Sequence, residues 1–239
     1  MQGAYDWAKN LDKIFEGHRY YKLKTDSQIH SQVIANQFIL TSTWTDNILE
    51  ALSTSKGETL AKHQLGISYK IKDLGEAKLI LGIYIDRDPT TGDIRLSQKA
   101  YCKQMLDKFN MSKCTPVSIP LLPGLTLSSD NCPTTNQKAK EMLNTPYCEA
   151  LGLLMWLQVA TQLDLLYTVN ILSHFVHNPG KQHWSALKHT LVYIRGTIYY
   201  GLVYQGGSDL NPTGYVNLDY TGCKDTYYLS GMESRVVIS

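Results

Sequence analysis

The most constraining feature of this sequence is a change of hydrophobic period near residue 97. Before it, runs rich in β-branched and aromatic residues, such as "SQVIANQFILTSTW" (31–44) and "EAKLILGIYIDRD" (76–88), are separated by turn residues. After it, apolar residues recur at helical spacing as far as Gly196. The order along the chain is therefore strands mixed with helices, then mostly helices, then a return to β signals in "GLVYQGG" (201–207) and "TGYVNLDYTG" (213–222), and we predict an α+β fold.

The first part is expected to contain a short helix, a series of strands and a second helix. Turn residues at 35–37 and in "TDN" (45–47) separate the strands, and Pro89 with Gly92 punctuates the clearest hairpin. The two helices are expected at residues 6–15 and 54–65.

The second part is expected to be mostly helical. Ser97 is a good N-cap for a helix over residues 98–110, and Thr145 with Pro146 at N1 opens another that runs to residue 159. Gly196 stands where a C′ residue would end the last helix. The remaining helices are expected at 164–177 and 181–195, and the polar, Pro-rich segment 112–144 is expected to be a flexible connection.

The composition excludes several classes of protein. The chain has 239 residues, 43% hydrophobic and 18% charged, with a net charge of +2, which gives no global signal for a polyanion partner. No apolar run approaches the roughly 20 residues that span a bilayer, so no membrane association is expected. The five cysteines form no CxxC pair and are interpreted as reduced intracellular thiols.

Asp46 and Asn47 form the first candidate site. An Asp-Asn pair at a hairpin tip is most often simple turn chemistry. The alternative is a tip that presents carboxylates to two divalent metal ions, which need several anionic oxygens for phosphoryl transfer. Magnesium prefers carboxylates and water, and an asparagine at the second position would remove one negative charge.

A row of cations forms the second candidate site. Lys181, Lys188 and Arg195 recur every seven residues on one face of the expected last helix, and such a row suits a phosphate backbone. The alternative is the solvated face of an ordinary amphipathic helix. Four histidines lie nearby in sequence but do not form the HExxH pattern of a zinc site.

Several longer strings, taken together, resemble the reverse transcriptase region of copia-type LTR retrotransposon Pol polyproteins. They occur in the family's order and at its spacing, and they cover most of the chain. The strings are "IKDLGEAKLILGIYIDRD" (71–88), "LSQKAYCKQMLDKFNM" (96–111), "TPYCEALGLLMWLQVATQLDLLYTVNILSHFVHNPGKQHW" (145–184), "ALKHTLVYIRGT" (186–197) and "GYVNLDYTGCKDT" (214–226).

The resemblance implies a layout of three parts. Residues 1–96 resemble the C-terminal half of a polymerase palm with a primer-grip-like hairpin, 97–200 a helical thumb and connection, and 201–239 the start of an RNase H-like domain. "TWTDNIL" lies where the family has Y-x-D-D-I-L, so Asp46 matches the first aspartate and Asn47 replaces the second. Asn217 stands in place of the first RNase H aspartate.

The resemblance also implies a function for the parent family and a defect in this chain. The family's cofactor is Mg²⁺, its partner is an RNA/DNA template–primer duplex, and its location is intracellular, in a cytoplasmic particle or the nucleus. Only Asp46 remains as a metal ligand, which indicates a truncated and degenerate copy without polymerase or RNase H activity. The alternatives are a non-catalytic nucleic-acid-binding remnant that uses the thumb-like helices, and a pseudogene product without activity.

Overall fold

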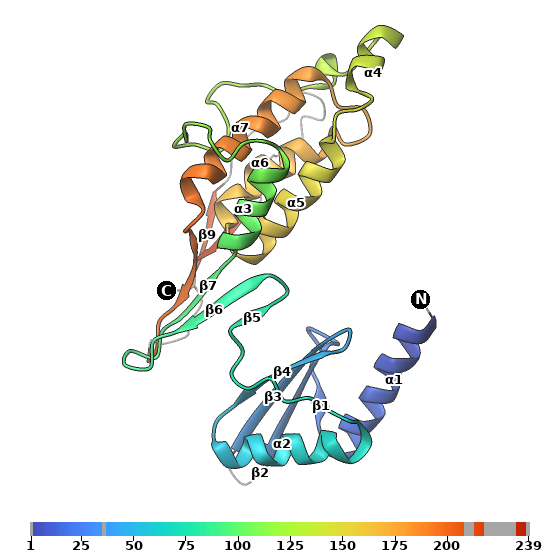
Figure 1. The fold of residues 1–239 in the computed structure, drawn as a ribbon, viewed down its shortest axis with the longest axis vertical. Coiled ribbons are helices and arrows are strands. Elements are labelled where there is room, and N and C mark those ends of the chain that lie inside the picture. The colour runs from blue at the N-terminus through green and yellow to red at the C-terminus, as the bar shows by residue number, and fades with distance from the viewer. Residues whose placement is uncertain (1, 35–36, 208–212, 218–232, 238–239) are drawn as a thin grey trace. The chain divides into compact units, whose positions relative to one another are not determined.

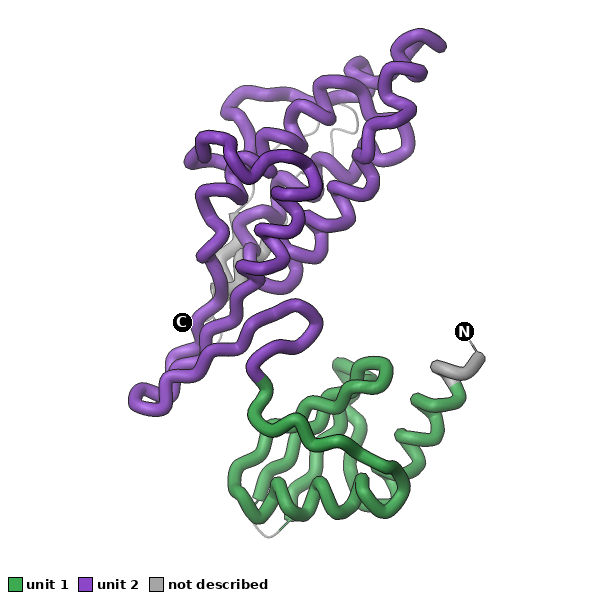
Figure 2. The backbone as a smooth tube through the Cα atoms, in the orientation of Figure 1, with its two compact units in different colours: residues 1–77 green, residues 78–239 purple. Residues whose placement is uncertain are grey.

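The computed structural model describes residues 2–34, 37–207, 213–217 and 233–237. The chain divides into two compact units, Met1–Ala77 and Lys78–Ser239 (Figure 2). The expected boundary at residue 96 separates a palm-like from a thumb-like part, whereas the two units are separated by compactness. The boundary at residue 96 stays a prediction. Helices and antiparallel sheets occur in both units, which confirms the α+β class (Figure 1).

Unit 1 is built on a four-stranded antiparallel sheet. Its strands are β1 (Tyr21–Lys22), β2 (Ile29–Ile34), β3 (Gln37–Trp44) and β4 (Asn47–Leu52), and they lie in this order. Successive residues of a strand point to opposite faces, so Ile39, Thr41 and Thr43 of β3 are buried while Phe38 and Trp44 are exposed. The sheet therefore has one covered face and one open face.

Two helices cover the same face of this sheet. Leu11 and Phe15 of α1 (Gln2–Gly17) and Ala61 and Leu65 of α2 (Ser55–Ser68) share one buried cluster with Ile39. Thr54 caps α2, because its side-chain oxygen accepts a hydrogen bond from Gly57 N at 3.2 Å. Both helices expected in the first part are confirmed, and each extends beyond its expected bounds. In the turn expected at 35–37, Ala35 and Asn36 lie outside the described residues.

Unit 2 contains a second antiparallel sheet with strands β5 (Leu79–Ile80), β6 (Ile83–Arg87), β7 (Ile94–Ser97) and β8 (Gly201–Tyr204). The hairpin between β6 and β7 confirms the prediction from Pro89 and Gly92, and Gly92 has the positive φ of 78° that favours glycine. β8 pairs with β7 across the whole intervening helical segment. That pairing has no counterpart in the local sequence pattern.

Between β7 and β8 lies a helical bundle with one buried core. Its helices are α3 (Lys99–Lys108), α4 (Asn136–Met142), α5 (Tyr147–Ala160), α6 (Leu166–Ser173) and α7 (Lys181–Thr197), with short 3₁₀ turns at Ser129–Asn131 and Leu163–Leu165. Leu106, Leu154, Leu172 and Leu191 are among the core residues. β9 (Thr213–Asn217) and β10 (Glu233–Val237) form a separate antiparallel pair.

Three helix boundaries differ from the predictions. Ser97 is not an N-cap, because it pairs with Tyr84 and Gly201 in the sheet, and Gln98 takes the cap position. Pro146 is the N-cap of α5 rather than its N1 residue. The helix expected over 164–177 is divided between the 3₁₀ turn and α6.

Gly196 does not end the last helix, because α7 continues to Thr197. A Cβ at Gly196 would lie 3.0 Å from Pro116 Cβ, so this glycine permits close packing of the preceding loop. The segment expected to be a flexible connection contains α4 and a 3₁₀ turn, and its first part follows α7. Among the described residues, no helix is both long enough and apolar enough to cross a membrane.

Candidate functional site

The hairpin between β3 and β4 positions the first candidate site. Trp44 and Asn47 are directly paired, so Thr45 and Asp46 alone form the turn. Thr45 has a φ of 51° and Asp46 is not among the residues with positive φ, which is the pattern of a type II′ hairpin turn. This turn holds Asp46 at the exposed tip and places Asn47 at the first position of β4.

The backbone at Thr45 is unusual. A β-branched residue with positive φ is a true outlier in backbone geometry, because its side chain crowds the carbonyl. Such positions cost on the order of 1–3 kcal/mol and occur often at functional sites. This strained residue directly precedes Asp46 in the turn.

The donor set at the tip is small. Asn47 Nδ2 donates to Asp46 Oδ1 over 3.4 Å, so the amide occupies one oxygen of the only carboxylate at the tip. No group of three or more His, Cys, Asp or Glu side chains that could hold a metal ion occurs in the described ranges. Because two divalent ions need several anionic oxygens, the residues present at this tip do not by themselves fit a two-metal site.

Glu50 is the carboxylate of β4, and the sequence pattern did not single it out. It lies opposite Thr41 on the covered face of the sheet, away from the open face that Trp44 and Asn47 share. Burial raises its pKa above the usual glutamate range; the charge of Lys62 opposes this shift, and Glu58 and Asp73 add to it. Strand alternation from Asn47 would have placed Glu50 inside, so Glu50 does not join Asp46.

Asn217, the third candidate residue, ends β9 in unit 2 and pairs with Glu233 of β10. Its side chain lies outside what the structure describes. The role inferred for it from the resemblance stays a prediction.

The basic row on α7 is present, but its three members are engaged differently. Lys181 Nζ lies 2.7 Å from Glu141 Oε2 of α4, although 73% of its side chain is exposed. That lysine holds the pKa of the Glu141 carboxyl below its usual range. Lys188 Nζ lies 5.9 Å from the ring centroid of Trp184. Two of the three cations therefore remain within reach of an external phosphate.

Arg195 is a structural anchor as well as a cation. Its Nε donates to Ser112 O at 2.8 Å. Thr190 Oγ1 donates to Pro120 O at 3.1 Å, and His189 Nε2 lies 3.2 Å from Ile119 O. Residues 112–120, called the strap below, are thus held along α7 next to the basic row.

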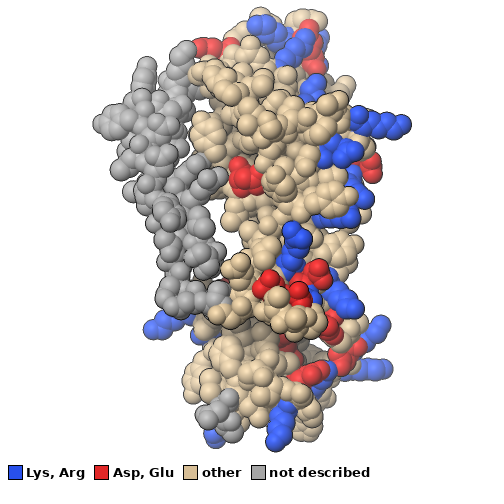
Figure 3. Space-filling model, turned by 90° about the vertical axis from the view of Figure 1, so that its left-hand side faces the viewer, with Lys and Arg blue, Asp and Glu red and all other residues tan. Residues whose placement is uncertain are grey.

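The surface charge on the face drawn in Figure 3 is mixed. On the described part of the face drawn in Figure 3, acidic side chains lie among the Lys and Arg side chains. Lys108, for example, pairs with Glu149. A phosphate backbone would therefore meet local groups of cations rather than one broad basic surface.

Comparisons with known proteins place this architecture in a class. The family described as "Reverse transcriptase (RNA-dependent DNA polymerase)" matches residues 1–123. The chain is 37% identical to the "Retrovirus-related Pol polyprotein from transposon TNT 1-94" of Nicotiana tabacum, over 92% of this chain and 17% of that protein. It is 35% identical to the Pol polyprotein from transposon RE1 of Arabidopsis thaliana, over 66% of this chain and 10% of that protein.

A shorter relative covers a similar region. The "Uncharacterized mitochondrial protein AtMg00810" of Arabidopsis thaliana is 32% identical over 77% of this chain and 72% of its own length. No solved structure matches the chain. The chain belongs to the reverse transcriptase (RNA-dependent DNA polymerase) family. Within it, the chain corresponds to part of the reverse transcriptase region of copia-type retrotransposon Pol polyproteins, as the resemblance had predicted.

Proposed function

We propose that this chain is a part of a retrotransposon reverse transcriptase that does not polymerise DNA as it stands. The observation that carries the proposal is the hairpin tip, where Asp46 is the only carboxylate and Asn47 is its neighbour. Electrostatic stabilisation is usually the largest catalytic term, so a site without its anionic ligands loses orders of magnitude in rate. The Mg²⁺ of the parent family would find too few oxygen ligands here.

The finer layout of palm, thumb and RNase H start belongs to the same proposal. Residues 1–96 would be the palm part, because unit 1 carries the Asp46 hairpin on a sheet with helices on one face and the β6–β7 hairpin would be the primer-grip-like hairpin. β4 is an edge strand of the four-stranded sheet in the described ranges, because β3 lies on one side of it and no described strand lies on the other. A further strand with another carboxylate could pair along that outer edge. The bundle between β7 and β8 would be the thumb and connection, and β9 would begin the RNase H-like part.

Primer extension tests the proposal directly. The purified chain is mixed with a primed RNA template, deoxynucleotides and either Mg²⁺ or Mn²⁺. No extension is expected with either ion, and an active reverse transcriptase in a parallel tube shows that the substrate is competent. Extension that disappears in Asp46→Asn would overturn the proposal.

The second candidate function is nucleic-acid binding without catalysis. It is favoured by the exposed side chain of Lys181 and by Lys188, which both lie on α7. Binding through phosphates weakens steeply with salt. The double variant Lys181→Glu with Lys188→Glu tests this function, because it removes two cations and leaves the hydrogen bond of Arg195 to the strap in place. If duplex affinity at low salt is unchanged in this double variant, the row is only a solvated face.

A pseudogene product without activity is the remaining alternative, and the open face of the unit 1 sheet favours it. Val33 is 67% exposed and Trp44 is 55% exposed on that face. Exposed apolar sheet surface promotes association. A cooperative, reversible thermal melt of the soluble chain would count against this alternative.

A further inference from the structure

His30 of β2 lies buried at the contact between α1 and the sheet of unit 1. Only 2% of the residue is exposed. Its ring is 4.6 Å from the ring of Phe15 on α1, at an angle of 30°. Phe15 also contacts Tyr20, with 5.0 Å between ring centroids. The histidine therefore forms part of the apolar packing that fixes α1 on the sheet.

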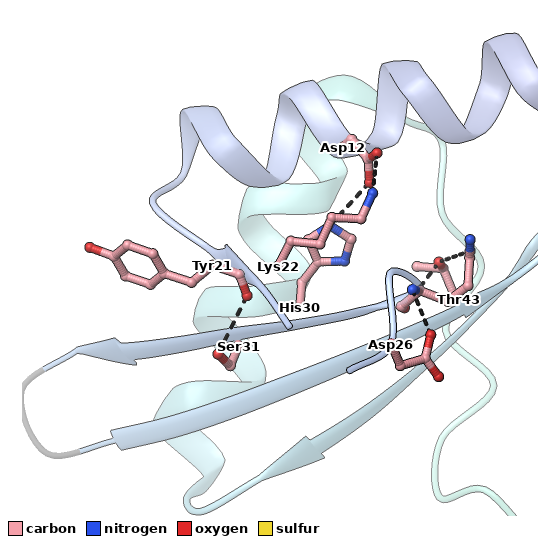
Figure 4. Close-up of polar contacts among 8 residues, drawn as sticks. Asp12, Tyr21, Lys22, Asp26, His30, Ser31 and Thr43 are labelled. Atoms are coloured by element: carbon pink, nitrogen blue, oxygen red, sulfur yellow. Dashed lines mark hydrogen bonds and ion pairs between the residues drawn. The ribbon is translucent and has the colours of Figure 1, made fainter. Parts of the chain in front are cut away.

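The polar atoms of His30 are incompletely satisfied. Its Nε2 lies 3.1 Å from Asp12 Oδ1 on α1, and Lys22 Nζ lies 2.6 Å from the other oxygen, Asp12 Oδ2 (Figure 4). Neither His30 Nδ1 nor His30 Nε2 has a hydrogen-bond partner of adequate geometry among the described residues, so the 3.1 Å approach of Asp12 is an ionic contact only. A second proton would give the buried ring a positive charge and leave its Nδ1–H group without a hydrogen-bond acceptor. Such a charge is costly to bury.

The charged groups around His30 act in both directions. Asp12 and Glu16 on α1 favour the protonated ring, whereas Lys22 on β1 disfavours it. β3 contributes a neutral residue, since Thr41 is the partner of His30 in the sheet. Burial is the largest influence, so the pKa of His30 is lower than the usual histidine value.

We propose that the protonation state of His30 controls the packing of α1 on the sheet. The helix stays docked while the ring is neutral and undocks more often when the ring is protonated. This device is independent of polymerase activity. A folded-state pKa below the unfolded one means that the unfolded state binds more protons in the window between the two values. The stabilisation is complete above the unfolded histidine pKa and is lost as pH falls from there toward the folded-state pKa.

Hydrogen exchange of the full chain, followed by mass spectrometry at pH 7.5 and 5.5, tests the proposal. After correction for intrinsic rates, the protection of α1 amides in the wild type is expected to fall by up to about tenfold per pH unit within the window. The protection of β3 amides should change less. His30→Gln, which cannot be protonated, is expected to remove this difference between α1 and β3.

Two further measurements keep the proposal falsifiable. His63 is an exposed histidine on α2, so His63→Gln is the matched control and should retain the pH dependence. If His30→Gln does not fold, an NMR titration of the His30 ring in the wild type decides instead. A ring that titrates at or above the unfolded histidine value, or an α1 that responds equally in His30→Gln, overturns the proposal.

Discussion

Ser97 and Gly201 lie directly opposite each other in the antiparallel ladder of β7 and β8, although the whole helical bundle separates them in sequence. The chain therefore enters and leaves the bundle at one point. A Cβ added to Gly201 would lie 2.1 Å from Leu96 O, closer than real Cβ contacts allow. The two strands can approach this closely only because the residue that faces Leu96 and Ser97 has no side chain.

This close approach makes Gly201 sensitive to substitution. Gly201→Ala is expected to separate β7 from β8 and to lower the free energy of unfolding of unit 2 by about 2 kcal/mol or more, since steric strain is among the causes of large effects. Gly152→Ala on α5 is the matched control, because nothing lies within 4 Å of its added Cβ. It should stabilise by about 0.5–1 kcal/mol. Chemical denaturation of both variants measures the difference, and equal effects would contradict the prediction.

The local sequence predicts much of this fold because many of its elements are decided locally. The hairpin at Pro89–Gly92 and the capped helix after Thr54 need only turn chemistry and a cap. The pairing of β7 with β8 depends on residues far apart in sequence and leaves no periodic signal. It also overrides local preference, because Ser97 is used in the ladder instead of as a cap.

At the candidate sites, too, the local features can be predicted from the sequence and the long-range contacts cannot. The turn at Thr45 and Asp46 can be predicted from the sequence, and its position in the family pattern stays a prediction of the resemblance. Neither the local sequence nor the resemblance predicts that Arg195, a candidate phosphate ligand, donates a hydrogen bond to Ser112 O. Gln162 is a further example, because its buried Nε2 donates to Thr197 O at 2.8 Å. Such contacts arise from tertiary packing, which a periodic pattern does not encode.

The strap should loosen when its first anchor is removed. Arg195→Met keeps an apolar stem of similar length but loses the hydrogen bond to Ser112 O, which adjoins the tryptic site at Lys113. Cleavage after Lys113 is expected to become several-fold faster, because proteolysis follows the population of locally open states. Mass spectrometry of timed digests identifies that cut.

The control for the strap is Lys181→Met, which removes a cation from the same helix but no contact with the strap. Its cleavage rate after Lys113 should match that of the wild type. If Arg195→Met is cleaved no faster than this control, Thr190 and His189 hold the strap without help from Arg195.

Glu50 should destabilise unit 1 at neutral pH. Burial raises its folded-state pKa above the unfolded value, so the folded state binds the proton more tightly. The contribution of Glu50 to stability is therefore most favourable in acid and becomes less favourable as pH rises from the unfolded pKa through the folded one. Oε1 of Glu50 also lacks a hydrogen-bond partner among the described residues. Glu50→Gln is thus expected to raise stability at pH 7 by about 1 kcal/mol, the scale of one desolvated polar group.

Thermal melts at pH 7 and pH 4 check the Glu50 prediction. The gain from Glu50→Gln should be present at pH 7 and shrink toward pH 4, where the wild-type carboxyl is increasingly protonated. Glu149→Gln is the control, because Glu149 lies in unit 2, is half exposed and pairs with Lys108, so its loss brings no gain. A Glu50→Gln variant that is less stable than the wild type at pH 7 would show that the charge of Glu50 is compensated inside the fold.

Asn47→Asp tests how far the hairpin is from a working metal site. The change introduces the second aspartate that the resemblance predicts for this position, and it replaces the Asn47 Nδ2 contact with Asp46 by two adjacent carboxylates. We expect no primer extension with Mg²⁺ or Mn²⁺, because two carboxylates on one turn still leave a two-metal site short of ligands. The pair should lower stability by a few tenths of a kcal/mol through like-charge repulsion at an exposed site. Extension by Asn47→Asp alone, absent in Asp46→Asn with Asn47→Asp, would mean that other groups of this chain complete the site.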